Sequence, residues 1–283
     1  MNLINNIRVL VRKNKARSLA KVLIAVVFFF SLFQLSGILI DYYINSQVLT
    51  EARALYEHAA EEDNASPKDA RSRARDTVPS VSFSAAQAEA VPHVRSPFIE
   101  LLQVNQDIVG WITIDDTHIR YPILQTMNNE YYLNRNYKRE ITRAGSIFMD
   151  FRNDISTSDP NTVLYGHRMK DGSMFGDLKK FLNQDFYNRH RTFTYDTLYQ
   201  SYRAEVFSVY YTTTDFNYIQ TEFDSDDEYS SFLQNIQGRS LYKSDTALTT
   251  EARIVTLSTC DYTLDKDEGR LVVHAKLVEA DDH

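Results

Sequence analysis

Three side chains in the C-terminal part of this 283-residue chain are of types that support nucleophilic chemistry. Cys260 is the only cysteine, and it ends an apolar, β-branched run just before the polar stretch 261–269. The thiolate, and not the thiol, is the strong nucleophile, and a nearby base or cation promotes its formation. His167 follows Gly166 at the end of another strand-like run, and Arg270 begins the run after Cys260. A lone cysteine is more often an inert, buried apolar residue. Only the combination of the three residues therefore supports a catalytic site.

The other six histidines are weaker candidates for a catalytic base. His274 falls inside the last expected strand, four residues from Arg270, or about 13 Å along a strand, so these two side chains cannot both meet one reacting atom. The remaining five occupy polar spacers, expected turns or the C-terminus: His58, His93, His118, His190 and His283.

The elements that must position these residues are short strands. Eight runs rich in β-branched or aromatic residues predict them: 111–114, 119–121, 146–149, 162–165, 191–195, 202–209, 252–259 and 270–278. Eight such strands with turn-rich spacers favour an antiparallel-rich barrel or sandwich. In the run ending at Cys260, alternation places Thr256, Ser258 and Cys260 on one face. The fold class is therefore mainly β with helical inserts.

Three helical segments accompany the strands. A short helix is expected over 96–104, with Pro97 in its first turn. Apolar residues at helical spacing predict further helices over 174–182 and 226–236, and the latter begins with three acidic residues that suit a helix N-terminus.

The N-terminal third predicts a membrane anchor followed by a tether. Residues 1–21 carry six basic and no acidic side chains, and 22–40 form an uncharged apolar run long enough to cross a bilayer. The positive-inside rule places residues 1–21 in the cytoplasm and the rest outside. A cleaved signal peptide is the alternative, but the apolar run is long and lacks a small-x-small cleavage site. Residues 41–95 are interpreted as an extracellular tether with a possible stalk helix over 47–62, and 96–283 as one folded domain.

Composition excludes several classes of protein. The net charge is −7 although residues 1–21 carry +6, so the remaining chain carries −13. Such an acidic chain is a poor nucleic-acid binder. A single cysteine excludes an intramolecular disulfide and any zinc site that needs two thiolates.

The reactive residues lie within motifs that resemble a known family. Thr256-Leu-Ser-Thr-Cys260, Arg270 ten residues later and the upstream Gly166-His167 resemble the signature of the sortases, the membrane-anchored cysteine transpeptidases of Gram-positive bacteria. The resemblance covers residues 96–278 and implies an eight-stranded sortase-type β-barrel with an N-terminal helix. Asn105-x-Asp107-x-Val-Gly-Trp-Ile112 and the long helix expected before the cysteine strand are similar to class B.

The resemblance implies a role for each site residue. Cys260 would attack the carbonyl of a Thr in a C-terminal sorting signal, His167 would exchange protons with the leaving and entering amines, and Arg270 would stabilise the oxyanion. Four further residues fall where class B enzymes contact the signal, and ordinary packing is the alternative for each of them: Ser258, Asp261, Asn129 and Leu133. No cofactor is implied, and the acidic loop 261–269 is interpreted as solvated rather than as a calcium site.

The implied partners are a surface protein with an Asn-Pro-x-Thr-like signal, an amine acceptor and the lipid bilayer. A peptidoglycan precursor is the first acceptor considered, and a pilin lysine, as in a pilin polymerase, is the alternative that the motifs do not separate. A non-enzymatic tethered adhesin would instead have an inert Cys260. A papain-like protease would have its histidine after the cysteine, the opposite order to His167 and Cys260.

Overall fold

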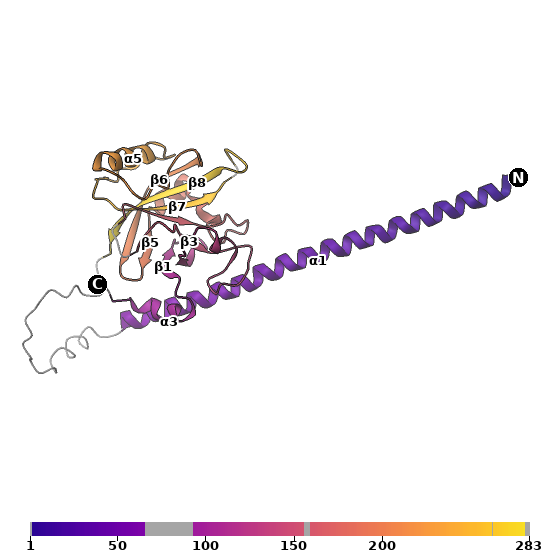
Figure 1. Ribbon diagram of the computed structural model, residues 1–283, viewed down its shortest axis with the longest axis horizontal. Coiled ribbons are helices and arrows are strands. Elements are labelled where there is room, and N and C mark those ends of the chain that lie inside the picture. The colour runs from indigo at the N-terminus through magenta and orange to yellow at the C-terminus, as the bar shows by residue number, and fades with distance from the viewer. Residues whose placement is uncertain (1, 66–92, 156–158, 262, 281–283) are drawn as a thin grey trace, which may run out of the picture. The chain divides into compact units, whose positions relative to one another are not determined.

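The computed structural model describes residues 2–65, 93–155, 159–261 and 263–280 (Figure 1). It divides into two compact units, residues 1–46 and 47–283. The first unit is the N-terminal part of helix α1 (Asn2–Ala65), and its apolar side chains from Val22 to Ile40 are largely exposed. Among the described helices, the segment Lys21–Glu61 is long and apolar enough to cross a membrane. The expected span 22–40 lies within that segment.

The second unit is built around a closed barrel of eight strands. In chain order these are β1 (Ile108–Thr113), β2 (Arg120–Leu124), β3 (Ile147–Met149), β4 (Asn161–Tyr165), β5 (Thr192–Thr197), β6 (Ser201–Thr213), β7 (Ile254–Cys260) and β8 (Gly269–Glu279). The order around the barrel is β1-β2-β3-β4-β7-β8-β6-β5. The pairs β2–β3 and β4–β7 are parallel, and the other pairs are antiparallel. The predicted eight-stranded barrel is therefore confirmed, with strand ends shifted by a few residues.

Short helices connect and cover the strands. They are η1 (Ser96–Phe98), α3 (Ile99–Val104), η2 (Tyr131–Asn134), η3 (Gly176–Leu182), α4 (Gln184–Arg189) and α5 (Asp226–Gly238). The helix expected over 226–236 is α5, and the Ser225 side chain caps it by accepting from the backbone N–H of Glu228. The helix expected over 174–182 is instead the 3₁₀ helix η3, because Met174 has a left-handed φ of 52° and still belongs to the preceding turn.

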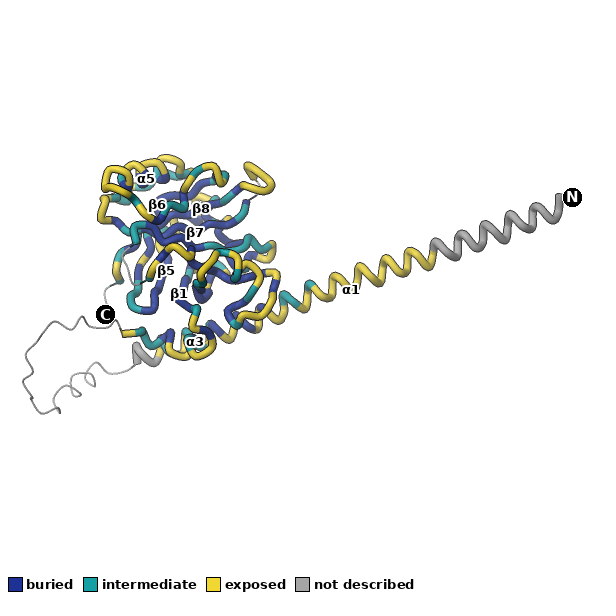
Figure 2. Tube along the Cα trace, in the orientation of Figure 1, coloured by how far each residue is buried: buried dark blue, intermediate teal, exposed yellow. Residues whose placement is uncertain are grey.

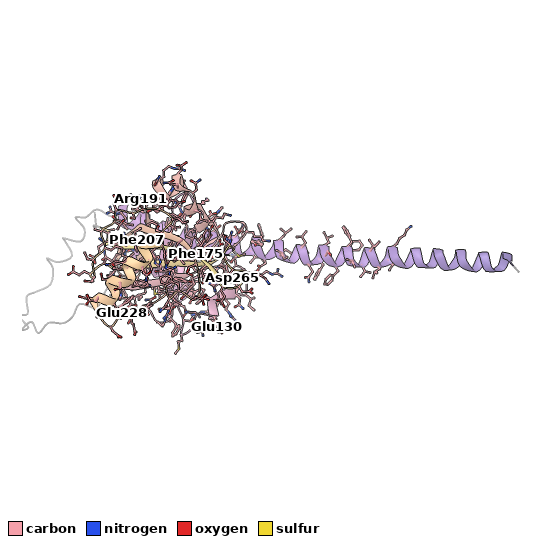
Figure 3. The ribbon with its side chains drawn as sticks, turned by 90° about the horizontal axis from the view of Figure 1, so that it is seen from above. Glu130, Phe175, Arg191, Phe207, Glu228 and Asp265 are labelled. Atoms are coloured by element: carbon pink, nitrogen blue, oxygen red, sulfur yellow. The ribbon has the colours of Figure 1, made fainter. Side chains whose placement is uncertain are left out.

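The barrel interior holds the largest apolar cluster. Alternation along β7 directs Val255 and Leu257 into it, together with Val273 and Ala275 of the neighbouring β8. Phe175, in the turn before η3, is fully buried in the same cluster and lies inside the mass of side chains in Figure 3, whereas Glu228 lies at the edge. The strands are accordingly the buried part of this unit, as Figure 2 shows.

Two further clusters lie outside the barrel wall. One side of α5 packs with Phe232 and Ile236 against Phe207 of β6 and Val272 of β8, and its other side is exposed (Figure 2). This one-sided contact is the one that the amphipathic pattern of 226–236 predicts.

The second outer cluster contains residues assigned above to the tether. Ala52 is fully buried, and the Tyr56 ring stacks on Trp111 at 4.2 Å between ring centroids. The Tyr56 hydroxyl also donates a hydrogen bond to the Asp196 carboxylate, and burial raises the pKa of Tyr56 far above its usual value. Residues 47–62 are helical as expected, and the compact unit that contains the barrel begins at residue 47 rather than at 96. Most of the rest of the expected tether, residues 66–92, lies outside the described residues.

Candidate active site

A pocket of about 220 Å³ lies where β4, β7 and β8 meet. Its lining contains six of the seven site residues expected from the sequence, and the full set is Asn129, Leu133, Phe148, Tyr165, Gly166, His167, Ser258, Thr259, Cys260 and Arg270. Phe148 and Tyr165 contact each other with ring centroids 5.4 Å apart and form an aromatic wall. The pocket therefore combines apolar walls with a small number of polar groups, the usual composition of a small-ligand site.

Cys260 ends the central one of three adjacent strands. It pairs with Arg270 across the antiparallel β7–β8 ladder. On the other side, β4 runs parallel to β7 with Tyr165 opposite Ser258, and His167 follows Tyr165 by two residues, as Cys260 follows Ser258. The thiol is partly exposed and not in a disulfide. The strand order thus brings the cysteine, the histidine and the arginine to one end of the barrel.

His167 is held by contacts on both sides of its turn. Its Nε2 lies 2.6 Å from the backbone oxygen of Leu133. A carbonyl oxygen only accepts, so Nε2 carries the proton of the neutral ring and Nδ1 is its acceptor nitrogen. The hydroxyl of Thr259 donates to the carbonyl of Gly166 at 2.8 Å, which ties the turn to β7. These contacts orient the imidazole before any substrate binds.

Arg270 is oriented by backbone carbonyls. Its Nη1 donates to the oxygen of Gly269 at 2.9 Å and to that of Asp267 at 3.3 Å. These acceptors are uncharged, so they fix the guanidinium without neutralising it. A fixed positive charge opposite Cys260 stabilises an oxyanion that forms on a thiol adduct.

Tyr218 is a site neighbour that the sequence analysis missed. Its hydroxyl lies 2.9 Å from the Oγ of Ser258, and the residue is buried. Burial raises the pKa of Tyr218, while the nearby Ser258 hydroxyl and Arg270 guanidinium act in the opposite direction. The segment around Tyr218 has neither strand alternation nor helical spacing, so no local pattern singles it out.

Asn129 and Leu133 also line the pocket, although they lie more than 120 residues before Cys260 in the sequence. Leu133 is 40% exposed, and its carbonyl binds His167. The Asn129 side chain donates from Nδ2 to Asp150 at 3.1 Å, and its Oδ1 accepts from the backbone of Phe151 at 3.0 Å. The structure therefore brings both residues to the pocket, as the sequence analysis expected.

Asp261 is the expected site residue that the structure does not bring to the pocket. Its side chain is 1% exposed and makes an ion pair with Arg168 at 2.7 Å between Oδ2 and Nη1. The Asp261 backbone still pairs with Gly269, so strand alternation extends past Cys260. Asp261 is accordingly absent from the lining of this pocket, and its expected contact with the signal stays a prediction.

The acidic loop after β7 is organised by its own backbone. The Oδ1 atom of Asp265 accepts from the N–H groups of Asp267 and Glu268, and these bonds hold the pKa of Asp265 below its usual value. Within the described ranges, which omit residue 262, no three His, Cys, Asp or Glu side chains are grouped so as to hold a metal ion.

Comparison with known proteins identifies the family. The sortase domain family matches residues 112–278. Sortase B of Listeria monocytogenes is 49% identical over 194 residues, which cover 69% of this chain and 79% of that protein.

Solved structures agree with this match. The crystal structure of Bacillus anthracis sortase B in complex with AAEK1 is 52% identical, with a TM-score of 0.69, and the match covers 86% of this chain and all of that one. The Staphylococcus aureus sortase B–substrate complex is 35% identical, also with a TM-score of 0.69, over 85% of this chain and 99% of that one. The chain therefore belongs to the sortase family of cysteine transpeptidases, and within it to the sortase B type.

Proposed function

We propose that this protein is a membrane-anchored transpeptidase that cleaves a C-terminal sorting signal after a Thr and joins the surface protein to a cell-wall amine. The observation that carries the proposal is the alignment of His167, Cys260 and Arg270 on three neighbouring strand ends around one pocket. Nucleophile, proton carrier and oxyanion donor are then within reach of one peptide bond.

The first half-reaction forms a thioacyl enzyme. The Cys260 thiolate adds to the Thr carbonyl carbon, and the electron pair moves to the oxygen, which Arg270 stabilises. As the carbonyl reforms, the carbon–nitrogen bond breaks and the leaving amine takes a proton from the His167 imidazolium. Because Nε2 already donates to Leu133, Nδ1 is the nitrogen that delivers this proton.

The second half-reaction transfers the acyl group to an amine. The entering amine attacks the thioester carbonyl, loses a proton to His167 and displaces the Cys260 thiolate, which restores the starting state. We assign the acceptor to a peptidoglycan precursor, since the family match is to sortase B. The apolar aromatic wall shields the thioester from water while the amine binds.

The signal binds along the wall formed by Asn129 and Leu133, with Ser258 near the scissile bond. In this arrangement Asn129 offers hydrogen bonds to the first residue of an Asn-Pro-x-Thr-like signal, and Leu133 packs against it. The Staphylococcus aureus relative was solved as a substrate complex with the same overall fold, which supports a peptide at this pocket.

The apolar helix supports a location of the enzyme at the cell membrane. The segment 22–40 spans the bilayer with residues 1–21 in the cytoplasm, because all six early cations lie on that side. The catalytic unit then lies outside the cell, where the cell-wall precursor and exported surface proteins meet.

Intact-mass spectrometry of the full chain in detergent tests the chemistry. The protein is incubated with peptides of several sorting-signal types, and hydroxylamine is then added to release any thioester. An adduct on the wild type that hydroxylamine removes, and none on Cys260→Ala, is the expected result. Its mass identifies the signal residues that remain on the enzyme.

Other results would contradict the proposal. A thiol that reacts with neither peptides nor iodoacetamide would favour a non-enzymatic tethered domain. An acyl enzyme that a pilin lysine peptide resolves, and a peptidoglycan-type amine does not, would assign the protein to pilus assembly.

A further inference from the structure

A buried carboxylate lies directly behind the pocket wall. Asp150 follows β3, and its side chain has no exposed surface. Its Oδ2 accepts from Asn129 at 3.1 Å, from the Tyr165 hydroxyl at 2.8 Å and from Nη2 of Arg152 at 2.8 Å. Its Oδ1 accepts from the backbone N–H and the Nε of Arg152 at 3.0 and 2.8 Å. With five donors the carboxylate is saturated, so it has no capacity to bind a substrate directly.

The charge of Asp150 is compensated within the wall. Arg152 forms a bidentate pair with it, the strongest geometry for a carboxylate. Burial acts to raise the pKa of Asp150, but the hydrogen bonds from Arg152 and Tyr165 hold it below its usual value. The group is thus a fixed anion that does not repel a ligand in the pocket.

The same carboxylate sets the orientation of the Asn129 amide. One Nδ2 hydrogen goes to Asp150, and Oδ1 accepts from the N–H of the next residue, Phe151. An amide turned by 180° would place oxygen against oxygen and N–H against N–H. Asn129 therefore keeps one N–H and one oxygen lone pair in defined positions, and it lines the pocket.

Arg152 also contacts the segment that carries Tyr218. Its Nη2 also donates to the backbone oxygen of Ile219 at 2.9 Å. Ile219 follows Tyr218, whose hydroxyl contacts Ser258 beside the nucleophile. One ion pair thus connects the wall that carries Asn129 with the segment that covers Ser258.

We propose that Asp150 is a positioning residue for specificity, which acts through Asn129 to select a side-chain amide at the first position of the signal. A ligand amide offers both a donor and an acceptor, and so complements the N–H and lone pair that Asn129 retains. A ligand without that amide leaves these groups unpaired in the pocket, which is the physical basis of strong discrimination. The inference rests on the proposed function and adds the residue that sets its selectivity.

Steady-state kinetics of the full chain in detergent test the inference. Two probe peptides are used, one containing Asn-Pro-Ala-Thr and one with Ala in place of the Asn. Asp150→Asn keeps the shape but removes the charge, and in either orientation its NH2 group faces donors, those of Arg152 or those of Asn129 and Tyr165. We expect KM for the Asn peptide to rise about tenfold, the equivalent of one hydrogen bond. KM for the Ala peptide and the rate of Cys260 alkylation by iodoacetamide should stay unchanged.

The matched control is another buried aspartate outside the pocket. Asp177 is 3% exposed. It accepts hydrogen bonds from His118 and forms an ion pair with Lys180. Asp177→Asn should reduce stability without changing the ratio of the two KM values. Arg152→Lys, at a side chain that is 36% exposed, retains the charge and loses the bidentate geometry. It should raise KM for the Asn peptide about threefold, and it provides the test if Asp150→Asn does not fold.

A double-mutant cycle separates positioning from a general structural effect. In an Asn129→Ala background, Asp150→Asn should no longer change KM for the Asn peptide, because the residue it positions is gone. Equal losses for both peptides, or additive effects with Asn129→Ala, would overturn the inference while leaving the transpeptidase intact. No acyl adduct on the wild type with any signal peptide would instead contradict the proposed function itself.

Discussion

Gly166 precedes His167 in a position that has no room for a methyl group. A Cβ built there would lie 2.4 Å from Cδ1 of Ile147 and 2.9 Å from two ring atoms of Phe175. Both neighbours are in the barrel core, at 1% and 0% exposure, so neither can move into solvent. The substitution Gly166→Ala must therefore displace the turn that carries His167.

The expected magnitude follows from two opposing effects. Overpacking a tight core costs about 1–3 kcal/mol, whereas Gly→Ala stabilises by about 0.4–1 kcal/mol through the unfolded chain. We expect Gly166→Ala to lower the free energy of unfolding by about 1–2 kcal/mol. A shift of the imidazole by even a fraction of an ångström should also slow acyl-enzyme formation by roughly tenfold or more.

A second substitution tests whether the contact with Ile147 is the cause. Ile147→Val removes the clashing Cδ1, and alone it should cost about 0.5–1.5 kcal/mol through the lost methyl group. In the Gly166→Ala background the same change should cost less or be stabilising, with a coupling energy of about 0.5–1.5 kcal/mol. Urea denaturation followed by circular dichroism gives the four stabilities, and the mass-spectrometric adduct assay gives the four acylation rates.

The control for this cycle is Gly238, the last residue of α5, where a Cβ would meet no atom within 4 Å. Gly238→Ala should be neutral or stabilising by up to about 1 kcal/mol. Strict additivity of Gly166→Ala and Ile147→Val, or an acylation rate unaffected by Gly166→Ala, would refute the packing argument.

Two further predictions concern stability. His274 is fully buried between two hydroxyls, and burial lowers its pKa to about 3. Because the unfolded chain takes up that proton near pH 6.5, the free energy of unfolding should fall as the pH drops from about 6.5 toward 3. Urea titrations of His274→Gln should show a flatter slope, and an unchanged slope would contradict the buried neutral imidazole. Removing residues 1–95 instead of 1–46 should lower stability by on the order of 3 kcal/mol, since Trp111 loses the ring of Tyr56. Equal stability of the two truncated chains would contradict the docking of residues 47–61.

Much of the fold was predictable because local patterns were strong. Residues of β7 alternate between the barrel interior and the outer face, and the one-sided apolar pattern of α5 matches its contact with β6 and β8. The segment predicted as helical over 174–182 is helical from residue 176, as a 3₁₀ helix, which also places residues three apart on one side. Its start was set by the turn at Met174, which depends on tertiary contacts.

The packing of residues 47–61 within the barrel unit was not predictable for a similar reason. Residues 47–61 have ordinary helical composition, and nothing local shows that Ala52 and Tyr56 face Trp111. That contact joins segments more than fifty residues apart, so a pattern within either segment could not reveal it. The same limit applies to Asp150, whose partners Asn129 and Tyr165 lie on different segments.

The site itself depends on two strand registers that meet at Cys260. The parallel β4–β7 register sets the level of His167, and the antiparallel β7–β8 register sets Arg270. A slip of one residue would move a side chain about 3.3 Å along the strand and turn it to the opposite face. Thr259 opposes such a slip, since its hydroxyl binds the Gly166 carbonyl across the parallel pair. The barrel that these strands form therefore fixes the relative positions of Cys260, His167 and Arg270, and motif spacing alone contains only the order in which they occur.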